Sequence, residues 1–90
     1  MDKLKPIQAY RRNWHTNDIV RYFDGTLYKI IKVILVVNMH KQEQQEIVTY
    51  QKLDSTDELL TISRTDFESE VDKEEYPNAI QRWKFEKVNL

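Results

Sequence analysis

The chain contains a single glycine, Gly25, which follows Asp24 between two stretches where apolar and polar residues alternate. An Asp-Gly pair in this setting is a strong hairpin signal, because glycine accepts the positive φ that a tight turn requires. The sequence therefore predicts two antiparallel strands, at 18–24 and 26–37. The far half of the second strand is apolar at every position and rich in β-branched residues, which predicts burial on both of its faces.

The rest of the chain predicts further short strands. The polar stretch 38–45 has no apolar period and is expected to be an exposed connection. Ser63 is a suitable N-cap for one helical turn that ends at Phe67. Three more strands are predicted at 46–53, 59–62 and about 80–88.

The amino-terminal segment has a different pattern. Ile7, Tyr10 and Trp14 follow Pro6 at helical spacing, which predicts a short amphipathic helix over 6–14. About nine residues do not form a stable helix alone in water, so this helix is expected to dock on the sheet. The predicted organisation is an extension at 1–17 and one domain at 18–90.

Composition places the chain among globular proteins. It has 90 residues, 40% hydrophobic and 32% charged, with a net charge of −1 and no cysteine. These values disfavour a disordered chain and a strongly basic nucleic-acid binder, and they exclude disulfides and cysteine-based zinc sites. No stretch approaches the roughly 20 apolar residues of a membrane span, and the first residues lack a signal peptide. We expect a protein of the bacterial or viral cytoplasm that does not bind membranes.

Several short motifs resemble one family. Residues 20–28 (VRYFDGTLY) are similar to the opening "YRHFKGNxY" of the bacterial and phage family called domain of unknown function 1653. Residues 46–50 (EIVTY) resemble its "E-x-V-V-Y" strand. The stretch 67–86 carries FESEVD, then Tyr-Pro, Gln and Phe-Glu, and resembles its "FxSEVD...YP...Q...FE" ending. The motifs occur in the same order over about 18–86.

This resemblance implies a mainly β fold, a small SH3-like barrel of about five antiparallel strands. Together with the pattern of the first residues, the expected architecture is such a barrel with a short N-terminal helix. The family carries no established activity, and a fold of this kind hosts many functions. The chain departs from the family at 60–63, where Leu-Thr-Ile-Ser replaces the usual "WVRP", and the predicted helix has no counterpart in the motif.

Catalytic signals are weak in this sequence. His15 and His40 stand in no metal-ligand spacing and are expected to be solvated. The serines lie in turn or cap settings, and one glycine cannot build a phosphate-binding loop. The acidic residues between Glu68 and Glu75 are interpreted as a solvated edge. The sequence around them has no apolar pattern that would bury a carboxyl group and so raise its pKa. We therefore expect a protein that is not an enzyme and has no metal site or cofactor.

One segment combines aromatic and basic residues. Aromatic rings stack on bases and guanidinium groups pair with phosphates, so this composition suits a nucleotide or single-stranded nucleic acid. The candidate binding residues are Arg11, Arg12, Trp14, Arg21 and Tyr22. In the alternative interpretation, Trp14 belongs to the docking face of the helix and the two neighbouring arginines are solvated.

Two functional hypotheses follow. The first is a non-catalytic binding or adaptor module that engages a protein partner, for example a phage-encoded modulator of a host protein. Its motivation is the missing catalytic pattern together with an uneven charge distribution: residues 1–52 carry nine Lys/Arg and five Asp/Glu, and residues 53–90 carry five and ten. The second hypothesis is a nucleotide or single-stranded nucleic-acid binder that uses the aromatic-basic segment 10–22.

Overall fold

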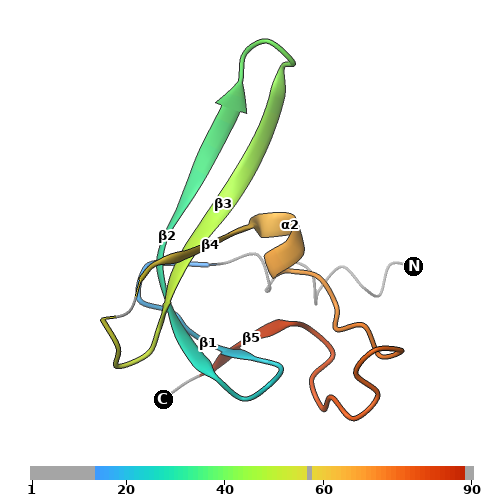
Figure 1. The fold of residues 1–90 in the computed structure, drawn as a ribbon. Coiled ribbons are helices and arrows are strands. Elements are labelled where there is room, and N and C mark those ends of the chain that lie inside the picture. The colour runs from blue at the N-terminus through green and yellow to red at the C-terminus, as the bar shows by residue number, and fades with distance from the viewer. Residues whose placement is uncertain (1–13, 57, 89–90) are drawn as a thin grey trace, which may run out of the picture.

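Five antiparallel strands form one open sheet in the computed structural model, which describes residues 14–56 and 58–88. The elements are β1 (Ile19–Tyr22), β2 (Leu27–Asn38), β3 (Glu43–Lys52), β4 (Leu60–Ser63), the one-turn helix α2 (Arg64–Phe67) and β5 (Phe85–Val88). The strand order is β4-β3-β2-β1-β5 (Figure 1). The prediction of a mainly β fold with five antiparallel strands is confirmed. The helix predicted at 6–14 lies outside the described residues, apart from Trp14.

The β1–β2 turn is the one that the Asp-Gly pair predicts. Gly25 has φ +96°, and its N–H donates to the Tyr22 carbonyl at 2.8 Å. The Tyr22 N–H donates to the Thr26 carbonyl at 2.8 Å, and the Asp24 carboxylate accepts from the Thr26 N–H at 2.9 Å. Side chain and backbone therefore both hold this turn closed.

The core lies between the sheet and α2. Val20, Ile30, Val48 and Phe67 are fully buried, and Phe67 stacks on Phe85 with ring centroids 4.4 Å apart. Ser63 caps α2 as predicted, because its Oγ accepts from the Asp66 N–H at 3.1 Å. The cap places the short helix so that Phe67 enters the core.

The β2–β3 hairpin differs from the sequence prediction in two ways. First, the strands continue into the stretch expected to be a connection, since Val36 pairs with Gln45 and Asn38 pairs with Glu43. Only residues 39–42 form the turn. Second, the predicted burial of β2 on both faces is wrong, because residues 34–39 are exposed. We call residues 33–46 the arm; it projects well beyond the other strands (Figure 1).

The last strand is shorter than predicted. β5 begins at Phe85, and residues 80–82 lie outside the sheet ladder. The side chain of Gln81 is buried and donates through Nε2 to the Arg21 and Trp83 carbonyls, each at 3.1 Å. A side-chain amide thus replaces the strand pairing that the sequence predicts there.

Candidate functional site

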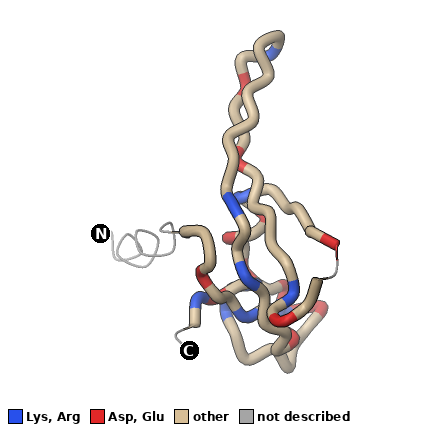
Figure 2. The backbone as a smooth tube through the Cα atoms, turned by 90° about the vertical axis from the view of Figure 1, so that its left-hand side faces the viewer, with Lys and Arg blue, Asp and Glu red and all other residues tan. Residues whose placement is uncertain are grey.

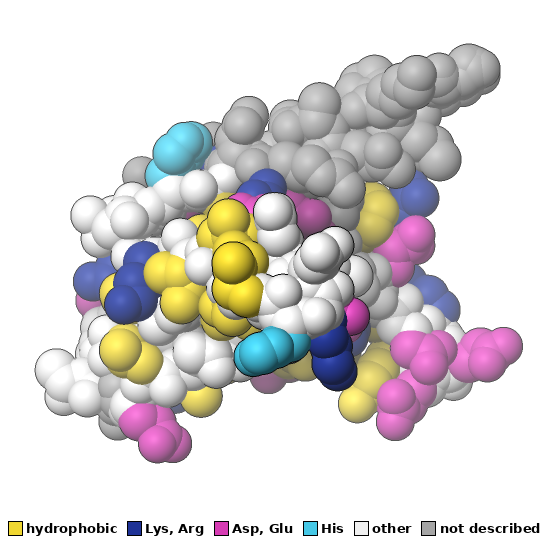
Figure 3. Space-filling view, turned by 90° about the horizontal axis from the view of Figure 1, so that it is seen from above, with side chains coloured by type: hydrophobic (Ala, Val, Ile, Leu, Met, Phe, Trp, Pro, Cys, Tyr) yellow, Lys and Arg dark blue, Asp and Glu magenta, His cyan; other side chains and the backbone are white. Residues whose placement is uncertain are grey.

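The arm exposes an unusual amount of apolar surface. Ile34, Leu35, Val36 and Val37 are 40–57% exposed, and Met39 at the tip is 80% exposed. The only charged residues of the arm are Lys41, Glu43 and Glu46 (Figure 2). Viewed from above, with the arm pointing at the viewer, hydrophobic side chains gather near the middle of the molecule (Figure 3). Large exposed apolar patches on a folded domain mark interaction sites.

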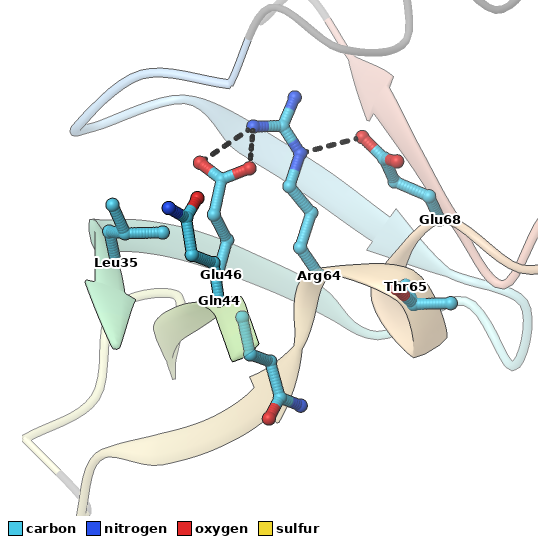
Figure 4. Close-up of a pocket in the computed structure, with 7 residues that line it drawn as sticks. Leu35, Gln44, Glu46, Arg64, Thr65 and Glu68 are labelled. Atoms are coloured by element: carbon cyan, nitrogen blue, oxygen red, sulfur yellow. Dashed lines mark hydrogen bonds and ion pairs between the residues drawn. The ribbon is translucent and has the colours of Figure 1, made fainter. Parts of the chain in front are cut away.

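A cavity lies where the arm meets α2. Its volume is about 470 Å³. The arm contributes Leu35 and three polar residues of β3, and α2 with its C-cap contributes the opposite wall. The lining residues are Leu35, Gln44, Gln45, Glu46, Arg64, Thr65 and Glu68 (Figure 4). We call this cavity the notch.

Arg64 joins the two walls of the notch. Its Nη1 donates to Glu46 of the arm at 3.0 and 3.2 Å, and its Nε donates to Glu68 at 3.0 Å. Both carboxylates point at the guanidinium in Figure 4. The Arg64 side chain is only 20% exposed, so these charge-assisted hydrogen bonds are partly shielded from water. The arm is therefore held in a defined position at its base.

The same network reaches the core. The Trp14 indole N–H donates to the Glu68 carboxylate at 2.7 Å, and the Trp14 ring meets the edge of Phe67 with centroids 4.9 Å apart. Glu68 is 9% exposed. The interpretation of all acidic residues from Glu68 to Glu75 as a solvated edge is thus wrong for Glu68, because Trp14 from a distant segment and Arg64 from the same helical turn both donate to its carboxylate.

The candidate binding residues of the aromatic-basic segment that the structure describes, Trp14, Arg21 and Tyr22, do not form one surface. The Trp14 ring is 9% exposed and packs in the core. Arg21 and Tyr22 follow each other in β1 and therefore point to opposite faces of the sheet. Arg21 Nε donates to Gln81 Oε1 at 2.7 Å, whereas the Tyr22 ring lies 4.9 Å from Phe85. Arg11 and Arg12 lie outside the described residues.

Arg21 also lines a second cavity, of about 320 Å³, near the β1–β2 turn. Phe23 and Ile80 contribute apolar walls, and Ile80 is 96% exposed. The Phe23 ring packs on Tyr76 with centroids 4.9 Å apart. This cavity faces away from the core cluster and offers fewer charged groups than the notch.

Among the residues that the structure describes, three tyrosines have a shifted pKa. Burial raises the pKa of Tyr50, and the neighbouring Tyr28 and Tyr22 raise it further. Burial is also the main cause of the raised pKa of Tyr22 and of Tyr28, with the charge of Asp24 second. Their rings contact one another and Phe85. The raised pKa values follow from the burial of these rings in an aromatic core.

The two histidines have different surroundings, since His15 Nδ1 lies 3.7 Å from the Asp18 carboxylate and His40 is in the turn of the arm. His15 and His40 are exposed, as predicted. Within residues 14–56 and 58–88, no group of three or more His, Cys, Asp or Glu side chains could hold a metal ion. No helix in that part of the chain has the length and apolarity needed to cross a membrane.

Sequence reasoning missed the residues that form the notch. The i,i+4 spacing of Arg64 and Glu68 on a helical turn was a signal for one ion pair. The third member, Glu46, lies 18 residues from Arg64, so only the fold brings it near. The exposure of Leu35 had no local signal either, because a run of apolar β-branched residues is typical of a buried strand.

Comparisons with protein-family models, curated proteins and solved structures find no match to this chain. The resemblance to the domain of unknown function 1653 family therefore stays a prediction from short motifs.

Proposed function

We propose that this protein is a non-catalytic binding module that engages a protein partner through the arm and the notch. The observation that carries the proposal is the arm itself, with four consecutive apolar side chains that are 40–57% exposed. A monomeric domain gains nothing in stability from apolar side chains held in water, whereas burial against a partner stabilises a complex.

The notch has the composition of a small recognition site. Leu35 provides an apolar wall, while Gln44, Thr65 and the Arg64–Glu46 pair provide polar groups around it. Protein interfaces combine an apolar centre with a polar rim in the same way. The chemistry fits an aliphatic or aromatic side chain of the partner in the notch, flanked by hydrogen-bonding groups.

The barrel type implied by the family resemblance belongs to the same proposal. β2 pairs with β1 at its start and with β3 along its whole length, with an irregularity between Ile30 and Lys32. Such irregularities bend a strand and increase its twist. A bent five-stranded sheet with one long shared strand supports the SH3-like type.

The experiment is affinity capture from bacterial lysate with matched variants. Thr65→Arg places a bulky charge in the notch, and Thr16→Arg places the same side chain at an exposed site that does not line it. We expect wild type and Thr16→Arg to retain the same proteins and Thr65→Arg to lose them. Equal retention by both variants would remove the notch from the proposal.

A titration against nucleotides and short oligonucleotides at low salt tests the alternative. Neutralisation of several phosphates makes affinity fall steeply as salt increases. Binding with that salt dependence, unaffected by Thr65→Arg, would replace the protein-binding proposal with a nucleic-acid function.

A further inference from the structure

The outer edge of β2 changes its surroundings along the strand. At its start, β2 pairs with β1 through Leu27, Tyr28 and Lys29. Ile30 then exchanges hydrogen bonds with the backbone at Asn17 and Asp18, at 2.7 and 2.9 Å. From residue 33 to residue 38, no strand in the described part of the chain pairs with this edge. The outer side of β2 in the arm is correspondingly open in Figure 1.

Natural proteins protect such edges with charges, proline, bulges or a short edge strand. Residues 33–37 (VILVV) contain no charge, no proline and no glycine, and they form a continuous ladder with β3. An unprotected, regular and apolar edge is a template for another strand. This property distinguishes the arm from an ordinary surface loop.

The other edge of the arm is different. Glu43 and Glu46 lie within the four residues of β3 that extend beyond its pairing with β4. If two copies paired antiparallel along these four residues, Glu43 of one copy would face Glu46 of the other, and like charges directly opposite are destabilising. The charge pattern therefore favours the β2 edge over the β3 edge.

The exposed side chains also favour an edge contact over a contact on one face. Successive strand residues point to opposite faces, so Leu35 and Val37 lie on one face and Ile34 and Val36 on the other. Both rows are about half exposed. A partner on one face would cover one row, whereas a strand added at the edge contacts both rows at once.

We propose that the partner at this edge is a second copy of the chain, paired antiparallel along β2 with Leu35 opposite Leu35. In this register Val33 faces Val37 and Ile34 faces Val36, so every apolar residue meets another. Lys32 faces Asn38, and no charge faces a like charge. The pairing is self-complementary, as a two-fold symmetric interface requires.

The pairing has a consequence for the notches. The two-fold axis of an antiparallel edge pair is perpendicular to the sheet, so paired residues lie on the same face. The two Leu35 side chains, and with them both notches, then face the same side of a four-stranded arm sheet. The dimer presents a wider surface than one chain. Dimerisation is independent of the function proposed above.

The size of the contact sets its strength. About six residues of each copy pair, which is less than the ~800 Å² per partner of a standard interface. We therefore expect a dimer that dissociates on dilution. Sedimentation velocity over a concentration series should show the mass rise from 10.9 kDa toward twice that value. A monomer at every concentration up to about 1 mM would overturn the proposal.

Single-cysteine variants test the register, because the natural chain has no cysteine. Opposite residues of an antiparallel pair have Cα atoms about 4.5–5.5 Å apart, within the range that a disulfide spans. Leu35→Cys should therefore form a disulfide-linked dimer under mild oxidation. In the same register the two Met39 positions are roughly 27 Å apart, so Met39→Cys should remain largely monomeric although it is more exposed. Efficient cross-linking of Met39→Cys without Leu35→Cys would overturn the register.

A charge variant tests the edge itself. Leu35→Lys introduces the residue that natural edge strands use for protection, and Gln44→Lys adds the same charge on the neighbouring strand of the arm. We expect Leu35→Lys to abolish dimerisation and Gln44→Lys to retain it, with unchanged circular dichroism for both. Equal dimerisation of the two variants would contradict pairing along β2. Since Thr65→Arg does not touch this edge, loss of partner capture in that variant and loss of the dimer are distinguishable.

Discussion

At the scale of single residues, Glu68 connects the core to the arm. Its carboxylate accepts from the Trp14 indole at 2.7 Å and from Arg64 at 3.0 Å, and Arg64 in turn binds Glu46. A partly buried carboxylate is stable only when donors replace the water that it loses. The network therefore fixes both the Trp14 side chain and the base of the arm.

Replacement of Glu68 tests this network. Glu68→Ala removes an acceptor from two donors in a poorly solvated site, so we expect the free energy of unfolding to fall by about 1–3 kcal/mol. Glu70→Ala is the matched control, because Glu70 is 56% exposed and its ion pair with Arg82 is 3.4 Å long. Exposed pairs contribute at most about 1 kcal/mol. Urea denaturation of both variants measures the difference, and equal losses would contradict a structural role for Glu68.

The buried tyrosines make stability depend on alkaline pH. Because burial raises the pKa of Tyr50 above its ordinary value of 10.0, the folded state retains the phenol proton where the unfolded state has lost it. This contribution is present below pH 10 and is lost as pH rises through the folded-state pKa. We expect the denaturation midpoint to fall above pH 10, and to fall less in Tyr50→Phe. An equal fall of the midpoint in wild type and Tyr50→Phe would contradict this contribution.

At the scale of elements, the β1–β2 hairpin shows what local sequence predicts well. The Asp24-Gly25 pair specifies the turn because its requirements are met within five residues. The Ser63 cap was predictable for the same reason. The β2–β3 hairpin was only partly predictable, since the polar residues 43–45 join the sheet through pairing with apolar residues of β2 and not through their own pattern.

Gly25→Val tests the first hairpin. The glycine has φ +96°, and a Cβ there would meet no atom within 4 Å, so the cost is backbone strain and not a clash. A β-branched residue at positive φ should lower the free energy of unfolding by ~1 kcal/mol or more. Thr26→Val introduces the same side chain at the next position and should cost less. Equal costs in a denaturant titration would show that the positive φ is not required.

At the scale of the whole molecule, the protein has two parts. The described residues outside 33–46, which we call the body, surround the core, and the arm has few buried residues. Val20, Ile30 and Val48 are fully buried in the body, whereas the arm is a two-stranded ladder exposed on both faces. Sequence reasoning could not separate these parts, because Ile30 and Val36 belong to one strand that is rich in β-branched residues on both sides of Lys32. Whether a strand residue is buried depends on what packs on it: Phe67 of α2 and Phe85 of β5 pack in the core of the body, whereas α2 meets the arm only at the notch.

Hydrogen exchange measures this division. A two-stranded hairpin without a covered face is marginally stable in water, so we expect arm amides to exchange through local opening well before those of Ile30 and Val48. Pairing of two arms would close that difference, because every second β2 amide between residues 33 and 38 points to the open edge and would gain a partner, and both apolar rows would gain cover. Protection of these amides should therefore rise with protein concentration in the wild type but not in Leu35→Lys, while the body amides change in neither. Uniform protection of arm and body in dilute solution would show instead that the arm is stable on its own, and the physical reason for a second strand at its edge would be lost.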